Sequence, residues 1–353
     1  MIGVSVSKDF NEFLVKQTPF VFFRLPNSSK IKCYYQQDHT LHFTNNFKID
    51  GFVMGTFQNS NQTPFIPNTH SLEYDFTKLQ VPYNDFYKTH IDENKASFLD
   101  LVNKTKTAIN RGVLKKLVVA RAQSFEEKVN PTSLFSNLLS LYPNAMVYYW
   151  YHPKLGSWVG ASPESLFSID SGDFQTMALA GTLPYKVDDD YNWGKKEKTE
   201  QRIVVDSILS VLRGLFQENE IKCSKTFTRR AGNLVHLCNI LSVKTDDFDL
   251  KQIIDQLHPT PAVGGIPKNE GVKFLSKHER FERSFYAGFF GPISGSGKAD
   301  LFVNLRCAQI ENDRFTLYVG AGITADSEAE EEWEETQKKA QTILRAIQFD
   351  ESH

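Results

Sequence analysis

Cysteine is scarce in this sequence. The 353 residues include only four cysteines, and no two of them have the Cys-x-x-Cys spacing; they are Cys33, Cys223, Cys238 and Cys307. This scarcity argues against a disulfide framework and against a structural zinc site, and it is typical of proteins from a reducing compartment.

An excess of charge of one sign is also missing. The chain has 40 lysine and arginine residues against 42 aspartate and glutamate residues, which gives a net charge of -2. Such a protein has no overall field that attracts nucleic acid or an anionic membrane. No apolar run approaches the roughly 20 residues that span a bilayer, and the first residues, MIGVSVSKDFNEF, lack the pattern of a secretory signal. We therefore expect a cytoplasmic protein that binds neither nucleic acid nor membrane.

Internal repeats and low-complexity linkers are absent as well. Helical spacing of apolar residues predicts helices over 93–112, 194–216 and 330–348. Apolar and β-branched runs predict strands over 116–125, 145–153, 157–170, 174–181, 234–244, 286–293, 299–310 and 314–323, with a hairpin between the last two. Asn, Pro and Ser predict a loop over 59–71. Because strands outnumber helices and several adjoin as hairpins, we predict an α+β fold with mostly antiparallel sheets.

The stretch YVGAGITADSEAEEEWEETQKKA, residues 318–340, combines two glycines with a helix rich in glutamate. Gly320 and Gly322 would let backbone N–H groups approach an anion such as a carboxylate; the alternative is a glycine bend that ends a strand. On the predicted helix, Glu331, Glu335 and Lys339 share one face. Glu335 lies in line with the apolar side, whereas Glu328, Glu330 and Glu334 are typical of a solvated face.

A second carboxylate has an unusual position. Glu200 lies at the start of the apolar stripe of the helix predicted over 194–216. Such a carboxylate indicates a salt bridge, a cap or a metal ligand. Two carboxylates from distant helices, with coordination positions left open, suit Mg²⁺, which keeps waters and shares an anionic substrate.

Arg306 is predicted to lie in the middle of a strand, in FVNLRCAQI. A guanidinium group in such a strand must be paired, and its planar fork fits a carboxylate. The partner is either an anionic ligand or a structural ion pair.

Two further residues have the chemistry of proton transfer. Lys116 enters the apolar run LVVAR, where loss of solvation would lower its pKa toward that of a general base; a surface lysine is the alternative. Glu164 follows Pro163 in a bend and is either a general acid or a turn residue. The GSGK of 295–298 predicts a β-turn rather than a phosphate loop, since no helix follows it.

Ten segments occur in a fixed order between residues 95 and 347: KLVVAR, GASPESL, ALAGT, EKTEQ, LVHL, LHPTPAVGGIPK, FYAGFFGPI, NLRCAQI, YVGAGI and EEWEET. Together they resemble the chorismate-utilising enzymes, and among them the isochorismate synthases. The resemblance implies one large domain with the anthranilate synthase component I-like fold, in which two face-packed, largely antiparallel sheets are flanked by helices. Residues 1–92 would form its β-rich N-terminal part and residues 93–353 its chorismate-binding catalytic region.

The resemblance also implies a Mg²⁺-dependent reaction that moves the chorismate hydroxyl from ring C4 to C2. Lys116 would activate the water that adds at C2, and Glu164 would protonate the departing hydroxyl. Glu200 and Glu335 would hold Mg²⁺ against the ring carboxylate. The other implied substrate contacts are Arg306, Lys339 and the backbone of Gly320, Ala321 and Gly322 at the enolpyruvyl carboxylate, and Tyr318, Leu179, Ala180, Gly181, Thr182 and His236 along the pocket.

Related activities are distinguished by single residues. The relatives that use ammonia have a glutamine at the position of Lys116, and the aminodeoxychorismate branch has a lysine at the position of Ala180. Salicylate synthase, which also expels pyruvate, shares the lysine base and remains the alternative; LHPTPAVGG and the chain length favour isochorismate synthase. We expect a monomer that needs no amidotransferase subunit. The sequence leaves open whether the product feeds menaquinone or siderophore synthesis.

Overall fold

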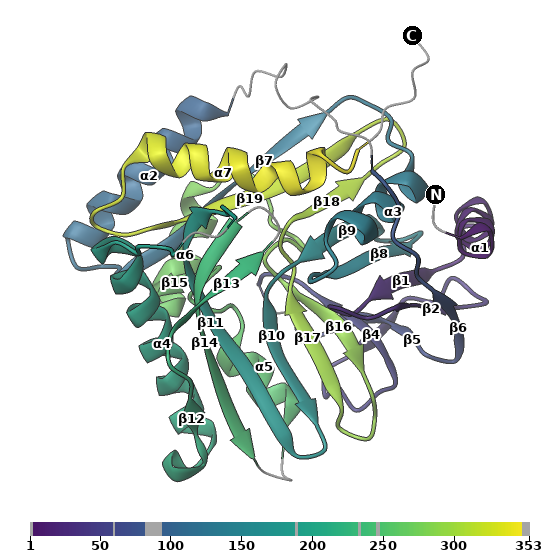
Figure 1. Cartoon of the computed structure of the whole chain (residues 1–353), viewed down its shortest axis with the longest axis horizontal. Coiled ribbons are helices and arrows are strands. Elements are labelled where there is room, and N and C mark those ends of the chain that lie inside the picture. Colours follow the sequence, from purple (N-terminus) through teal and green to yellow (C-terminus); the bar gives the residue numbers. More distant parts are fainter. Residues whose placement is uncertain are drawn as a thin grey trace.

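Two antiparallel sheets form the centre of the molecule in the computed structural model, which describes residues 3–58, 61–81, 94–187, 190–231, 234–244 and 248–347 (Figure 1). The first sheet has nine strands in the order β15-β7-β19-β18-β9-β8-β1-β2-β6. Their bounds are β1 Phe20–Arg24, β2 Lys30–Tyr35, β6 His70–Asp75, β7 Lys116–Phe125, β8 Met146–His152, β9 Gly156–Ser162, β15 Gly265–Ile266, β18 Cys307–Ile310 and β19 Phe315–Ile323.

The second sheet runs in the order β12-β14-β11-β10-β17-β16-β4-β5-β3, and β13 also pairs with β14. Its strands are β3 His42–Thr44, β4 Gly51–Gly55, β5 Thr63–Pro67, β10 Ser165–Asp170, β11 Asp173–Pro184, β12 Lys222–Cys223, β13 Phe227–Ala231, β14 Leu234–Lys244, β16 Phe289–Ile293 and β17 Ala299–Val303. The α+β prediction with antiparallel sheets is therefore confirmed. Strands from the N-terminal part lie in both sheets, and the boundary predicted at residue 92 falls outside the described residues.

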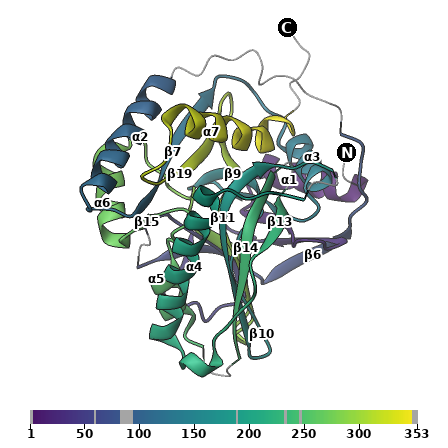
Figure 2. The same cartoon turned by 60° about the vertical axis from the view of Figure 1, so that its left-hand side comes forward.

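The helices pack on the outer surfaces of the sheets (Figures 1 and 2). They are α1 Val4–Val15, α2 Lys95–Asn110, α3 Pro131–Leu141, α4 Lys195–Leu215, α5 Leu250–Leu257, α6 Lys268–His278 and α7 Ala329–Leu344. Helix α7 contacts β19 and α2, and α4 contacts β11 and β14. None of the helices in the described ranges has the length and apolar content that crossing a bilayer requires.

Strand β1 shows why the first sheet is covered on both faces. All five of its residues, FVFFR, are buried. Val21 and Phe23 belong to the core between the two sheets, whereas Phe20 and Phe22 belong to a second core under α1, α3 and α7. Since successive side chains of a strand point to opposite faces, a strand whose side chains are all buried requires a cover on each side.

Two of the crossovers between the sheets lie side by side. The first, at Pro163 and Glu164, joins β9 of one sheet to β10 of the other; the second, around Arg306, joins β17 to β18. Backbone hydrogen bonds tie them together, from Val303 N to Glu164 O (3.0 Å) and from Ala161 N to Arg306 O (3.1 Å).

Three local predictions were wrong. The segment predicted as a strand over 157–170 is divided into β9 and β10, which lie in different sheets. Arg306 does not lie within a strand: 299–310 is divided into β17 and β18, and Arg306 has a φ of 51°. The local sequence does not mark this break, because pairing with two different sheets sets it. The loop predicted over 59–71 contains β5 and the start of β6; Phe65 and Ile66 find ladder partners in β4 despite the flanking prolines.

Candidate active site

A cavity lies beside the two crossovers and encloses about 690 Å³ of space, its opening to solvent included. Most of the predicted site residues line it, from both sheets and from α4 and α7. These are Lys116, Glu164, Leu179, Ala180, Glu200, His236, Arg306, Tyr318, Gly320, Gly322, Glu335 and Lys339. Of the other three, Thr182 lines a neighbouring acidic cavity, Gly181 contributes backbone contacts, and Ala321 is fully buried in the core.

Lys116 and Glu200 form an ion pair at one end of the cavity. Lys116 is 1% exposed, so it is not a surface lysine, and its Nζ lies 2.8 Å from Glu200 Oε1. The other carboxylate oxygen accepts a hydrogen bond from Gly181 N (3.2 Å). These two contacts fix the orientation of the Glu200 carboxylate beside Lys116 in the cavity lining.

Glycine is required at two positions around this pair. A Cβ at Gly322 would lie 2.8 Å from Glu200 Oε1 and 3.2 Å from Lys116 Cε. Gly181 has a φ of 68°, where L side chains are strained, and a Cβ there would meet Glu197 at 3.0 Å. The missing side chains of Gly322 and Gly181 therefore leave room for the neighbouring charged side chains.

Glu164 is buried at the first crossover, with 5% of its surface exposed. Burial raises its pKa to about 7, against the opposing charges of Lys116, Lys339 and Arg306. Removal of a carboxylate from water disfavours its charged form. Glu164 is therefore poised to hold and donate a proton near neutral pH.

Arg306 and Lys339 form a cationic part of the lining. Within the described residues Arg306 has no ion-pair partner; its Nη1 makes only a long contact with Lys339 O (3.5 Å). Lys339 Nζ donates to Glu335 Oε1 (2.6 Å) and to Gly320 O (2.9 Å). The structural ion pair considered for Arg306 is thus not formed, and its planar fork can receive a carboxylate ligand.

The backbone expected to clamp a carboxylate lies at the end of β19. Gly320 and Gly322 are part of this strand rather than of a bend after it. The described ladder with β18 stops at Tyr318, so the strand beyond it has an unpaired edge. N–H groups along a strand point alternately to its two edges. The N–H of Ala321 therefore points to one edge, and those of Gly320 and Gly322 point to the other. The three N–H groups cannot all face one ligand.

His236 presents one ring nitrogen without a partner. Its Nδ1 lies 2.7 Å from Gly181 O and 3.2 Å from Thr182 Oγ1. A carbonyl oxygen only accepts, so Nδ1 carries the proton and donates to it. Burial, followed by the charge of Arg306, lowers the pKa of His236 to about 3. The neutral ring leaves Nε2 as a buried acceptor without a partner in the described residues, suited to a ligand hydroxyl.

The acidic part of the lining continues beyond the predicted residues. Burial raises the pKa of Glu332, and the charge of Glu335 raises it further; Lys196 Nζ lies 3.0 Å from its Oε1. Burial alone would raise the pKa of Glu335 too, but Lys339, Lys196 and Arg306 together lower it. Glu332 and Glu197 were not predicted from the sequence, although each precedes a predicted ligand by one helical turn.

Magnesium fits the chemistry of this donor set. Glu200 and Glu335 line the same cavity, and carboxylate oxygens are the ligands that Mg²⁺ prefers. The mutual repulsion of Glu332 and Glu335 is what a divalent cation would relieve. In the described residues both predicted ligands are instead paired with lysines, and no preformed group of three metal-binding side chains occurs.

A buried ion pair supports the part of the cavity wall that Val118 and Val263 form. Arg283 binds Glu279 through two hydrogen bonds of 2.6 and 2.8 Å. Its other nitrogen contacts reach Val263 O (2.9 Å) and Val118 O (2.8 Å), and both valines line the cavity. Glu279 and Arg283 are only four residues apart in the sequence, but the fold alone brings them to the segments of Val118 and Val263.

Comparisons with known proteins agree with this geometry. Residues 53–348 match the family model described as chorismate binding enzyme. Anthranilate synthase component 1 of Aquifex aeolicus is 27% identical over 76% of this chain and 56% of its own length. Isochorismate synthase MenF of Escherichia coli is 29% identical over 73% of this chain and 61% of its own length.

A solved structure has the same fold. It is described as a 2,3-dihydroxybenzoate-specific isochorismate synthase, DhbC, from Bacillus anthracis, and it superposes with a TM-score of 0.80 at 22% identity, over 97% of this chain and 99% of that one. The chain spans about three fifths of the length of the two curated relatives. The family match covers most of the sequence and shows that this chain belongs to the chorismate-binding enzyme family, with which the fold agrees.

Proposed function

We propose that the protein is a Mg²⁺-dependent isochorismate synthase, which interconverts chorismate and isochorismate. The observation that carries the proposal is that Lys116 and Glu164 line one cavity, with the pKa of Glu164 raised to about 7. A carboxyl group with this pKa can act as a general acid near neutral pH. One curated relative carries the name isochorismate synthase.

The proposed reaction needs no oxidant or reductant. Lys116 accepts a proton from water as the water oxygen bonds to ring C2, and the ring double bonds shift. As the double bonds shift, the bond between C4 and its hydroxyl oxygen breaks, and Glu164 donates the proton with which this hydroxyl leaves as water. One water molecule is consumed and one is released, so that substrate and product are isomers.

The remaining residues would hold the two carboxylates of the substrate. Arg306 and Lys339 would bind the enolpyruvyl carboxylate, and His236 Nε2 would accept a hydrogen bond from a ring hydroxyl. Glu200 and Glu335 would hold Mg²⁺, which supplies positive charge for the ring carboxylate. Lys116 can accept a proton only as a free amine, so its ion pair with Glu200 must open first.

Lys116 also favours water over ammonia as the nucleophile. Water is a weak nucleophile and needs a base beside it, whereas ammonia does not. Although one relative is an anthranilate synthase component, we therefore expect no aminated product and no requirement for an amidotransferase subunit.

The test is a product assay with the purified protein. We expect isochorismate from chorismate with Mg²⁺, the same final ratio when the reaction starts from isochorismate, and no conversion after chelation of the metal. Chromatography should show the same product when ammonium is added. Formation of salicylate with stoichiometric pyruvate would instead identify a salicylate synthase, and anthranilate formed with ammonium would overturn the proposal.

A further inference from the structure

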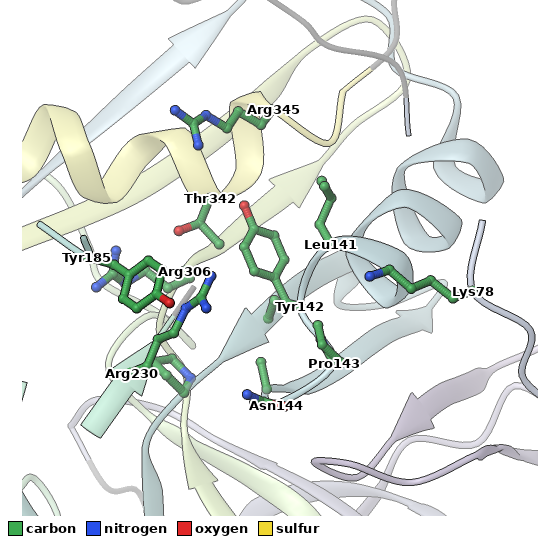
Figure 3. A pocket seen from close by; sticks show the side chains of 13 residues that line it. Lys78, Leu141, Tyr142, Pro143, Asn144, Tyr185, Arg230, Arg306, Thr342 and Arg345 are labelled. Atoms are coloured by element: carbon green, nitrogen blue, oxygen red, sulfur yellow. The ribbon is translucent and has the colours of Figure 1, made fainter. Parts of the chain in front are cut away.

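A second and larger cavity adjoins the candidate active site (Figure 3). It encloses about 1290 Å³, its opening to solvent included. Pro163 and Arg306 line both cavities. The two cavities therefore meet at the crossovers that carry these two residues.

The charged side chains that line this second cavity are all cationic. Lys78, Arg230, Arg306 and Arg345 are among its described lining residues, and none of these lining residues is an aspartate or a glutamate. Figure 3 shows Lys78, Arg230 and Arg345 around the cavity, each from a different part of the chain. We call this space the basic cavity.

Individual contacts hold these cations in place. The Arg230 guanidinium stacks on the Tyr185 ring at 3.5 Å from its centroid. Arg345 follows the last residue of α7, and its Nε is buried with no hydrogen-bond partner in the described residues. Charges of one sign gathered in one lining attract a ligand of opposite sign.

The active-site cavity adjoins a space of opposite charge as well. Glu200, Gly322 and Glu335 also line a third cavity, whose other lining includes Glu197, Glu330, Glu331, Glu332 and Glu334 and only two cations, Lys196 and Lys338. We call it the acidic cavity. A molecule with two carboxylates is repelled there and attracted on the basic side.

We propose that the basic cavity is the access route of the substrate, and that its cations draw a dicarboxylate toward Arg306. This inference rests on the proposed function, because chorismate is the dianion to be drawn in. Charged clefts raise association rates by roughly 10–10³-fold. Over distances beyond about 10 Å this attraction is screened at 0.1 M salt, so that salt should remove the advantage.

The experiment measures two quantities for each variant: turnover, and the association rate of chorismate by stopped-flow tryptophan fluorescence. For Lys78→Gln combined with Arg345→Gln, we expect kcat/KM and the association rate to fall about 3–10-fold at low ionic strength, with kcat unchanged. At 0.5 M salt the difference from wild type should be nearly lost.

Two controls carry the same change of charge elsewhere. Lys338→Gln removes a cation from the acidic cavity, and Lys222→Gln removes an exposed one from β12, at the far end of the molecule from α7 (Figure 1). Both should keep the wild-type association rate within about twofold, the small effect of a distant exposed charge. Equal falls in all variants would mean a general effect of net charge and would overturn the access route.

A steric variant tests the route without reference to charge. Asn144 is exposed at the rim of the basic cavity, and Asn144→Trp should slow association at low and at high salt alike. Wild-type association in this variant and in the charge variants together would sink the inference. If the wild type binds chorismate but does not convert it, the proposed function fails while the association rates still decide the access route.

Discussion

The basic and the acidic cavities meet at one active-site cavity, yet the chain builds them in different ways. The acidic one is made by two helices, each with carboxylates one turn apart: Glu197 and Glu200 on α4, Glu332 and Glu335 on α7. The basic one gathers cations from a loop, a strand, a crossover and a helix end. A metal ion needs several ligands at fixed short distances, which rigid helices provide. Attraction of an anion requires only charge of one sign nearby.

The two residues proposed to transfer protons lie on different sides of the active-site cavity. Lys116 is paired with Glu200 on the acidic side, and Glu164 lies at the crossover that is bonded to that of Arg306. A substrate that enters from the basic cavity and is held by a metal ion on the acidic side would therefore lie with its ring between Lys116 and Glu164.

The largest effect should come from Lys116→Gln, which removes the amine from the acidic side and leaves its carboxylates. Glutamine cannot accept a proton, and loss of a general base lowers the rate by about 10²–10⁴-fold. Kinetics with Lys115→Gln, a change at the neighbouring exposed lysine, serves as the control. Chorismate binding in the presence of Mg²⁺ should persist in both variants. Turnover at the wild-type rate in Lys116→Gln would remove the base from the mechanism.

A smaller effect is expected from Glu335→Gln, which breaks the acidic side directly. The Mg²⁺ concentration for half-maximal activity should rise by at least about 10–100-fold, as it does when even outer ligands of a metal are lost. KM for chorismate should rise with it, because metal and substrate share the site. The exposed neighbour Glu334 provides the matched change, Glu334→Gln, for the same titration. An unchanged magnesium dependence would make Glu335 a partner of Lys339 only.

The pH dependence of kcat/KM should reveal Glu164, the proposed acid on the side of Arg306. Because burial raises the pKa of Glu164 to about 7, the proton that it must donate is present below pH 7 and lost above it. We expect kcat/KM to fall about tenfold for each pH unit above that value. A pH profile of Glu164→Gln should lack this limb at a much lower activity. A wild-type profile that is flat from pH 6 to 9 would contradict the assignment.

The contrast between the two sides also explains what the sequence could predict. Glu200, Glu335 and Lys339 lie on helices whose apolar spacing is local, so their common orientation was foreseen. Strands β7 and β14 have the predicted bounds, because each is one mostly apolar segment that stays within a single sheet. The assignment of chemical roles, however, came from the resemblance to a family rather than from spacing.

What could not be predicted depends on contacts between distant segments. The left-handed backbone of Arg306 follows from the change of sheet at that residue, which no local pattern encodes. Lys78, Arg230 and Arg345 are separated by more than a hundred residues each, and only the packed fold brings them to one cavity. Glu332 was passed over among its glutamate neighbours, although it is 2% exposed.

The smallest effect is expected from Lys196→Gln, which removes a positive charge from the acidic cavity. Lys196 partly neutralises Glu332, at 3.0 Å from its Oε1, and is about one third exposed. Pairs of this exposure contribute about 0.2–1 kcal/mol, so Lys196→Gln should lower the Mg²⁺ requirement by roughly 1.5–5-fold. The exposed Lys198 on the same helix gives the control, Lys198→Gln, in the same magnesium titration. A higher requirement in Lys196→Gln would show that this lysine orders the carboxylates for the metal instead of competing with it.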